Sequence, residues 1–146
     1  MIGDIVDKAG GNPDVVLSAI GSDTRVGQKF LKYGFGYGGP CLPRDNRALG
    51  VYAKKIGLSA KISEATDSSN SDHLDFMVQR SKENKTIILE KVTYKPESTM
   101  LVESQKLKFA DKLADLGVSV IIRERKSVID ELKKEFGEKF HYEIID

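Results

Sequence analysis

Apolar residues in the first part of the chain recur at helical spacing. Residues 2–9 place isoleucine, valine and alanine side chains on one helix face, and the glycines at 10–11 end the pattern. Asn12-Pro13-Asp14 then supplies an N-cap residue, a first-turn proline and a first-turn acid. The sequence therefore predicts two short helices, the second of which ends near Gly21.

Two further helices are predicted beyond a glycine-rich stretch. Residues 21–44 hold six glycines and two prolines, which predicts a long ordered loop of the kind that often carries function. Asp45 is expected to cap the next helix, which ends at Gly57. A polar helix follows over about 63–81, with one narrow apolar side typical of a connector. Its expected contact side chains are Ala65, Ser69, His73, Phe76 and Met77.

The hydrophobic period changes after residue 82. Short apolar, β-branched runs alternate with helical patterns, which is typical of parallel strands joined by helices. The expected elements are a strand at 86–89, a helix at 104–116, a strand at 118–122, a helix capped by Ser127 and a strand at 141–145. The predicted fold class is α + α/β: a helical dimerisation segment at 1–82, then a small parallel-sheet, Rossmann-like β-α-β-α-β domain at 83–146.

Composition excludes several classes of protein. The 146 residues carry a net charge of +1, with acidic and basic residues intermixed, so a nucleic-acid partner is not expected. Neither an apolar run long enough to cross a membrane nor a signal peptide is found. One cysteine and two distant histidines fit neither a disulfide framework nor a zinc site. We therefore expect a soluble, cytoplasmic protein without a metal.

The stretch most informative about chemistry is 34–45. Its glycines follow no strand and therefore do not indicate a dinucleotide site, but they allow main-chain N–H groups to approach a ligand closely. Cys41 lies between these glycines and the Arg44-Asp45 pair, and a nearby guanidinium stabilises the thiolate that a sulfur nucleophile needs. The alternative is that Cys41 is a small buried core residue.

Two motifs resemble a known family. Asp23-Thr24-Arg25-Val26-Gly27 and the run over 35–46 are similar to the signature of the UDP-glucose/GDP-mannose dehydrogenases. Tyr94-Lys95-Pro96, followed by Glu103-Ser104, resembles the Lys-Pro turn that opens the family's C-terminal nucleotide-sugar domain. The family oxidises the C6 alcohol of a nucleotide sugar to a carboxylate with two NAD⁺.

The resemblance implies roles for the residues around the cysteine. Cys41 matches the catalytic cysteine, which captures the intermediate aldehyde as a thiohemiacetal that is then oxidised to a thioester. Asp45 matches the acid that orients water or a neighbouring base. Arg44 stands where the family most often has lysine; it keeps the positive charge but cannot shuttle a proton near neutral pH.

The resemblance also implies substrate contacts. Arg25 matches the arginine that reaches across the family dimer to the partner's bound nucleotide diphosphate, and Lys95 matches a lysine that contacts phosphate or sugar. The glycines of the loop match positions that wrap the sugar, where a side chain would block it. The loop residues implied in substrate binding are Phe35, Gly36, Tyr37, Gly38 and Gly39.

The implied partners are a UDP- or GDP-sugar and a second copy of the chain. The apolar residues expected at a homodimer interface are Ile2, Ile5, Val6, Val15, Val16 and Ile20. Since the sequence has no strand–Gly-x-Gly-x-x-Gly–helix unit, we expect the isolated chain to be inactive and the family's NAD cofactor to require a part supplied by another chain for any activity. The alternative is a truncated relative that binds a nucleotide sugar, or assembles, without catalysis.

Overall fold

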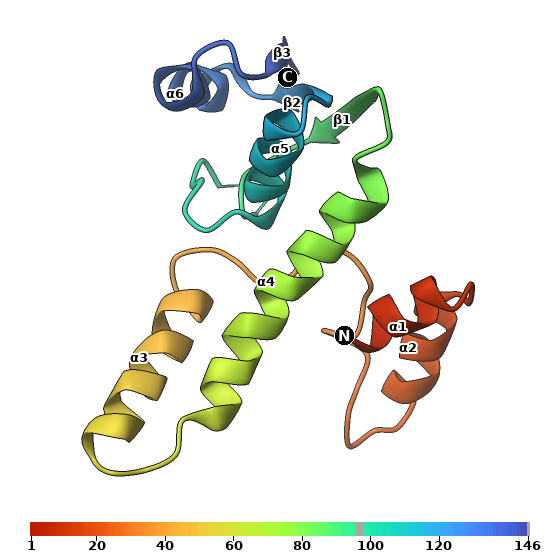
Figure 1. Ribbon diagram of the computed structural model, residues 1–146, viewed down its shortest axis with the longest axis vertical. Helices are drawn as coiled ribbons and strands as arrows, with labels where there is room; N and C mark the ends of the chain where they lie inside the picture. The colour runs from red at the N-terminus through yellow and green to blue at the C-terminus, as the bar shows by residue number, and fades with distance from the viewer. Residues whose placement is uncertain (96–97, 146) are drawn as a thin grey trace. The chain divides into compact units, whose positions relative to one another are not determined.

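The computed structural model of the protein describes residues 1–95 and 98–145 (Figure 1). Four helices come first, and strands alternate with helices afterwards, as the sequence predicts. The elements are α1 (Ile2–Lys8), α2 (Pro13–Gly21), α3 (Leu42–Lys55), α4 (Lys61–Ser81), β1 (Thr86–Glu90), α5 (Gln105–Asp115), β2 (Ser119–Glu124), α6 (Lys126–Phe136) and β3 (His141–Ile144).

The chain divides into two compact units, Met1–Phe35 and Gly36–Asp146. The predicted boundary near residue 82 is where the secondary structure changes from helical to α/β, but the units separate much earlier in the chain. The physical reason is that α4 packs against α5, so the two parts on either side of residue 82 share contacts. The glycine-rich stretch thus begins in one unit and ends in the other.

The first unit is a pair of short helices with the end of its loop folded back. The Asn12 side chain accepts hydrogen bonds from the N–H groups of Asp14 and Val15, at 3.0 and 3.3 Å, which confirms the predicted N-cap. Gly3 faces the ring of Tyr33, whose hydroxyl donates to Asp4 at 3.0 Å. These contacts connect Tyr33, near the end of the unit, to α1.

In the second unit, α3 and α4 lie side by side as a hairpin. Ser63 and Asn46 exchange side-chain to main-chain hydrogen bonds of 2.6 and 2.9 Å, and Gly50 lets the helices approach closely at Ser63. The prediction that Asp45 caps α3 is wrong. The helix begins at Leu42 with Cys41 at the N-cap position, because Pro43 is well suited to a first helical turn.

The side of the connector helix α4 that the sequence suggests is partly buried. Leu74 and Val78 are buried and Ala65 is exposed. Of the other expected contact side chains, the half-buried ones are Ser69, His73, Phe76 and Met77. The helix contacts α3 at its start and α5 near its end, so the buried face changes along its length.

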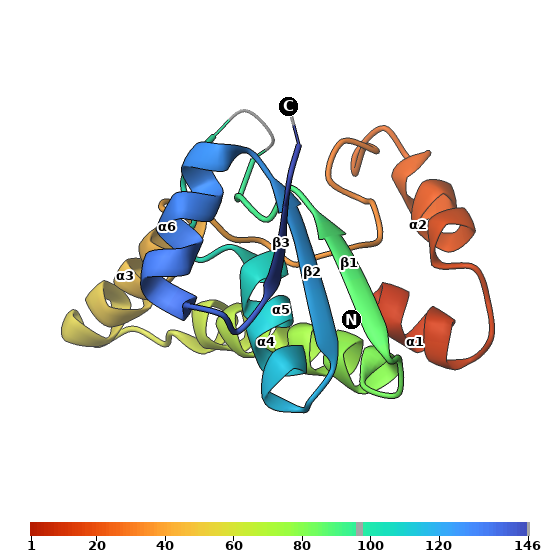
Figure 2. The ribbon, with the colours of Figure 1, turned by 90° about the horizontal axis from the view of Figure 1, so that it is seen from above.

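The three strands form a parallel sheet in the order β1-β2-β3, which confirms the predicted β-α-β-α-β arrangement. Both crossover helices, α5 and α6, lie on one face of the sheet (Figure 2). The core between them is closely packed, and each large side chain in it contributes about 1.5–3 kcal/mol by leaving water. Its fully or nearly fully buried members are Val120, Ile122, Leu113, Val128, Leu132 and Phe140.

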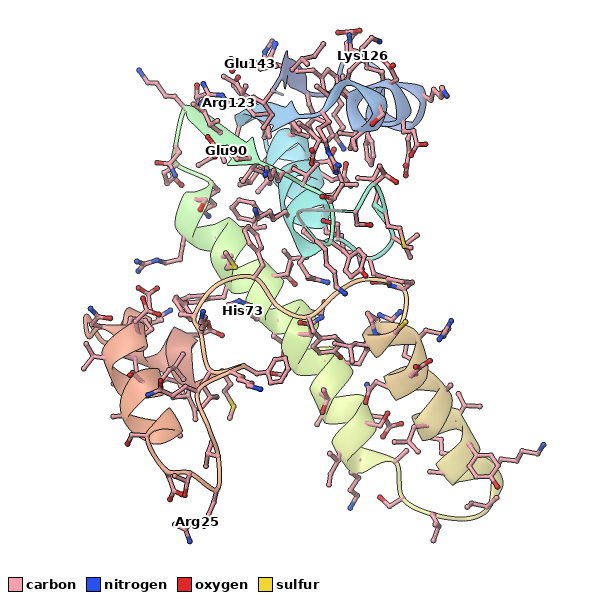
Figure 3. All side chains as sticks on the ribbon, turned by 180° about the vertical axis from the view of Figure 1, so that it is seen from behind. Arg25, His73, Glu90, Arg123, Lys126 and Glu143 are labelled. Atoms are coloured by element: carbon pink, nitrogen blue, oxygen red, sulfur yellow. The ribbon has the colours of Figure 1, made fainter. Side chains whose placement is uncertain are left out.

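The other face of the sheet is polar and partly exposed. Arg123, at its centre, pairs with Glu143 on β3 at 2.6 Å and with Glu90 on β1 at 3.8 Å (Figure 3). Ile88 on the same face is about half exposed. Ser127 does not cap α6, which begins at Lys126 directly after β2; the predicted cap is one residue inside the helix.

Candidate functional site

The loop at 36–41 is packed against other parts of its own unit. The amide of Asn70, on α4, donates to the main-chain oxygen of Tyr37 at 2.9 Å. A side chain at Gly36 would overlap Asn70, and one at Gly38 would overlap the main-chain oxygen of Glu103. Small residues are therefore required here by the protein's own packing, whereas the family resemblance attributes them to room for a sugar.

The two family-like motifs meet in this unit. Gly39, with φ of +82°, lies against the ring of Tyr94, and a side chain there would overlap that ring. Lys95 places its ammonium 5.2 Å from the centre of the same ring, and Thr93 donates to the Lys95 carbonyl at 2.9 Å. Pro96 lies outside the described residues. The fold thus brings the glycine loop and the Tyr94-Lys95 turn together, although they lie far apart in the sequence.

Cys41 ends this loop and begins α3. Its thiol is exposed, so the alternative that it is a buried core residue is wrong. Its main-chain oxygen accepts a hydrogen bond from the Asp45 N–H at 2.8 Å, and this bond closes the first turn of the helix. Exposure makes the sulfur accessible to an electrophile.

Arg44 and Asp45 project from the first turn of α3 and pair with each other. Nε of Arg44 lies 2.8 Å from Oδ1 of Asp45, and both side chains are exposed. The hydrogen bond to Asp45 raises the pKa of the Arg44 guanidinium, with a smaller contribution from the charge on Cys41. Most of this arginine's interaction is therefore with the carboxylate and not with the thiol.

Arg25 and Phe35 belong to the first unit. The side chain of Arg25 is 88% exposed and is labelled in Figure 3. Its Nε and Nη2 donate hydrogen bonds to the Asp23 carboxylate, and the Nη2–Oδ2 distance is 2.6 Å. This pairing lowers the pKa of Asp23. Because the guanidinium of Arg25 is exposed, it can release the Asp23 carboxylate and bind a phosphate in its place.

A network of charged side chains that the sequence pattern does not indicate lies beside the loop. Arg47 on α3 contacts Asp67 on α4 at 3.0 Å and Glu103 at 2.8 Å, and Lys108 on α5 also binds Glu103. Only Glu103 lies within a recognisable motif. No spacing rule could have brought the other three together, since they come from three different helices.

The Tyr37 hydroxyl lies beside this network. It is buried, and within residues 1–95 and 98–145 no hydrogen-bond partner reaches it. Burial raises the pKa of Tyr37, with a further contribution from the carboxylate of Asp67. A buried phenol without a partner is costly, so this hydroxyl is available to a group brought by a ligand or a water.

The described residues do not fit the NAD cofactor of the family. A dinucleotide is held by a glycine-rich turn between the first strand and helix of a βαβ unit. The corresponding connection here, 91–104, has no glycine, and Lys91 and Glu103 within it adopt positive φ without being glycine. We therefore assign no NAD-binding role to these residues.

Two other kinds of feature are missing from the part of the chain that the structure covers. There, no three or more His, Cys, Asp or Glu side chains are grouped as metal ligands would be. Of the helices in the same residues, none combines the length and the apolar character needed to span a bilayer.

Comparison with known sequences identifies relatives of this chain. The sequence profile of the UDP-glucose/GDP-mannose dehydrogenase family, central domain, matches residues 1–72. UDP-glucose 6-dehydrogenase TuaD of Bacillus subtilis is 31% identical over 125 residues, which cover 82% of this chain and 27% of the relative. UDP-glucose 6-dehydrogenase of Rhizobium meliloti is 31% identical over 127 residues, covering 82% and 29%. The chain therefore spans under a third of the length of these relatives.

Two solved structures share the fold. A UDP-glucose dehydrogenase from Pyrobaculum islandicum superimposes with a TM-score of 0.85 at 24% identity, covering 97% of this chain and 34% of the other. A GDP-mannose dehydrogenase from Pseudomonas aeruginosa gives a TM-score of 0.66 at 23% identity, covering 97% and 36%. The two solved structures agree with the sequence matches in fold. The profile, which covers the first motif, and the relatives, which match 82% of this chain, show that the chain belongs to the UDP-glucose/GDP-mannose dehydrogenase family.

Proposed function

We propose that this chain is the nucleotide-sugar-binding and dimerising part of an NAD-dependent 6-dehydrogenase that converts a sugar C6 alcohol to a uronic acid. The observation that carries the proposal is the meeting of the 36–41 loop with the Tyr94-Lys95 turn, beside an exposed Cys41. UDP-glucose is the first substrate to test, because the relatives from Bacillus subtilis and Rhizobium meliloti carry that name.

Cys41 is the proposed nucleophile. Its sulfur adds to the C6 aldehyde carbon of the bound intermediate, forming a C–S bond while the carbonyl oxygen takes up a proton, which gives a thiohemiacetal. Asp45, in the first turn of α3, is the residue proposed to orient the water that hydrolyses the later thioester. The hydride acceptor of the overall oxidation is nicotinamide, for which the described residues offer no site, so we assign them no step of hydride transfer.

Arg25 and Lys95 are the proposed contacts to the diphosphate and sugar. Both are exposed cations, and Lys95 lies on the Tyr94 ring next to the glycine loop. Arg25 can hold two phosphate oxygens at once through its planar fork. In a dimer, Arg25 would serve the partner's site, as the family resemblance implies.

The alternative is a module that binds the nucleotide sugar, or assembles, without oxidising it. Two observations favour it: Arg44 is occupied by Asp45, and the glycines of the loop face the protein's own atoms. In this alternative Cys41 is an accessible thiol with no role in chemistry.

Protection of Cys41 from iodoacetamide distinguishes the two. If the proposal is correct, UDP-glucose slows labelling, and the 6-aldehyde of UDP-glucose slows it more, because only the aldehyde forms a bond to sulfur. A binding module gives equal protection by both compounds. Lys95→Ala serves as the control for specificity and should weaken protection by both. The absence of protection by either compound would contradict nucleotide-sugar binding itself.

The dimer proposal rests on the α3–α4 hairpin. Leu49 is 63% exposed and Ile62 86%, and the two line an apolar groove of about 620 Å³ with Ala53 and Ala60. Exposed apolar surface of this extent is typical of a protein interface, and a homodimer is the commonest assembly that buries one. Ile5 and Val15 in the first unit, which the helical pattern suggested for the interface, are also exposed.

A further inference from the structure

Arg47 connects three parts of the second unit through one side chain. It projects from the second turn of α3, the helix that Cys41 begins. Its Nε contacts both carboxylate oxygens of Asp67 at 3.0 and 3.1 Å, and its Nη1 contacts Glu103 at 2.8 Å. A planar guanidinium can make two such contacts in different directions, which an ammonium cannot do with the same geometry.

Glu103 is held in an unfavourable conformation at the far end of this connection. Its φ of +53° is in the left-handed region, which costs a non-glycine residue free energy unless its surroundings enforce it. Arg47 and Lys108 hold its carboxylate, and its main-chain oxygen packs against Gly38. The side chain therefore fixes the main chain, and the main chain closes one side of the 36–41 loop.

Helix α4 makes a second contact with the loop. Asn70 binds the Tyr37 carbonyl from that helix, and Asp67, one turn before Asn70, is the other partner of Arg47. The loop thus contacts both Glu103 and helix α4, and Arg47 forms hydrogen bonds with Glu103 and with Asp67 of that helix.

From this geometry we propose that Arg47 is a positioning residue for the cysteine loop: it acts through Glu103 and Asp67 to hold residues 36–41 in place. Its hydrogen-bond partners are Asp67 and Glu103, and neither is a proposed catalytic residue. This proposal rests on the function proposed above. In that function Cys41 and the loop that binds the sugar must be held in fixed positions relative to each other.

Amide hydrogen exchange on the full chain tests the proposal without any ligand. In Arg47→Ala, exchange in 36–41 should accelerate by about five- to tenfold, the scale expected for losing charge-assisted hydrogen bonds that are partly exposed. Exchange in β1 should stay unchanged. Arg123→Ala is the matched control, since Arg123 also bridges two carboxylates but lies on the open face of the sheet; it should leave the loop unaffected.

Rescue and coupling separate positioning from general stabilisation. Arg47→Lys keeps the positive charge but not the planar guanidinium. It should therefore restore only part of the protection of residues 36–41 from amide exchange. Glu103→Gln should accelerate loop exchange by itself, and combining it with Arg47→Ala should add less than the sum of the two. Equal acceleration throughout the unit, additive effects, or an unaffected loop in Arg47→Ala would each overturn the proposal.

A second measurement connects the residue to ligand binding. Protection of Cys41 by UDP-glucose should weaken severalfold in Arg47→Ala and remain normal in Arg123→Ala. If the wild-type chain is not protected at all, the proposed function fails, and the exchange experiment alone decides whether Arg47 positions the loop.

Discussion

Helices α3 and α6 have similar amphipathic patterns but different surroundings. α6 buries Val128, Ile129 and Leu132 against the sheet. α3 buries Pro43 and Gly50, and its larger apolar side chains, including Leu49 and Tyr52, remain exposed. The α/β part therefore buries the apolar face of α6 within the same unit, whereas the larger apolar side chains of α3 remain exposed. The apolar residues of α6 stabilise the fold, whereas those of α3 remain at the surface, where the dimer proposed above would bury them.

The largest effect is expected from the buried helix. Leu132→Ala should lower the free energy of unfolding by about 2–5 kcal/mol, since the side chain is fully buried and its loss leaves a cavity. Leu49→Ala, the same change on an exposed helix, should cost a monomer less than about 0.5 kcal/mol. Urea unfolding at low protein concentration measures both. Similar losses for the two variants would show that the hairpin is as well packed as the α/β part.

The next effect concerns association. Leu49→Glu should weaken the proposed dimer by at least about tenfold, because it places a charge in an apolar interface. Sedimentation equilibrium over a concentration series gives the dissociation constant. Ile144→Glu, at an exposed position on β3, is the control and should leave the dissociation constant unchanged. A wild-type chain that stays monomeric at tens of micromolar, roughly the range in which a stable interface is filled, would refute the dimer.

The contact between the loop and the Tyr94 turn gives an intermediate effect. Gly39→Ala should destabilise the protein by about 1–3 kcal/mol, since it combines a positive φ with overlap of the Tyr94 ring. Gly10→Ala has a similar φ of +78° but open space around it, so it reports strain alone. Thermal unfolding of both variants gives the difference due to the ring. An equal loss in both would mean that the loop does not pack on Tyr94.

The smallest effect is expected with pH. Lys108, and then Arg47, lower the pKa of Glu103 below its ordinary value of 4.5. The carboxylate therefore contributes stability that is fully present above the unfolded pKa and is lost as the pH falls through the lower, folded value. The contribution is about 1 kcal/mol or less, because its partners are partly exposed. Urea unfolding between pH 6 and pH 3 (roughly the range that spans the titration) should show a shallower decline for Glu103→Gln. Parallel curves for the two proteins would contradict the pairing.

Local signals in the sequence predicted most elements correctly. Asn12 caps its helix as expected, and Ser104 caps α5 in the same way, because an N-cap depends on a side chain and N–H groups two or three residues away. Asp45 and Ser127 are of suitable residue types but lie inside their helices. Where those helices begin is decided by Pro43 in one case and by the end of β2 in the other.

The sequence by itself determined the order of the elements, the parallel sheet and the motifs that indicate the family, because each depends on neighbouring residues or on a regular period. Only the tertiary structure decided that the glycine loop packs on Tyr94 and Glu103, that Cys41 is exposed, and that Arg47 joins three segments. These contacts join residues that are distant in the chain. Their geometry depends on how α3, α4 and α5 pack together, and no local pattern records it.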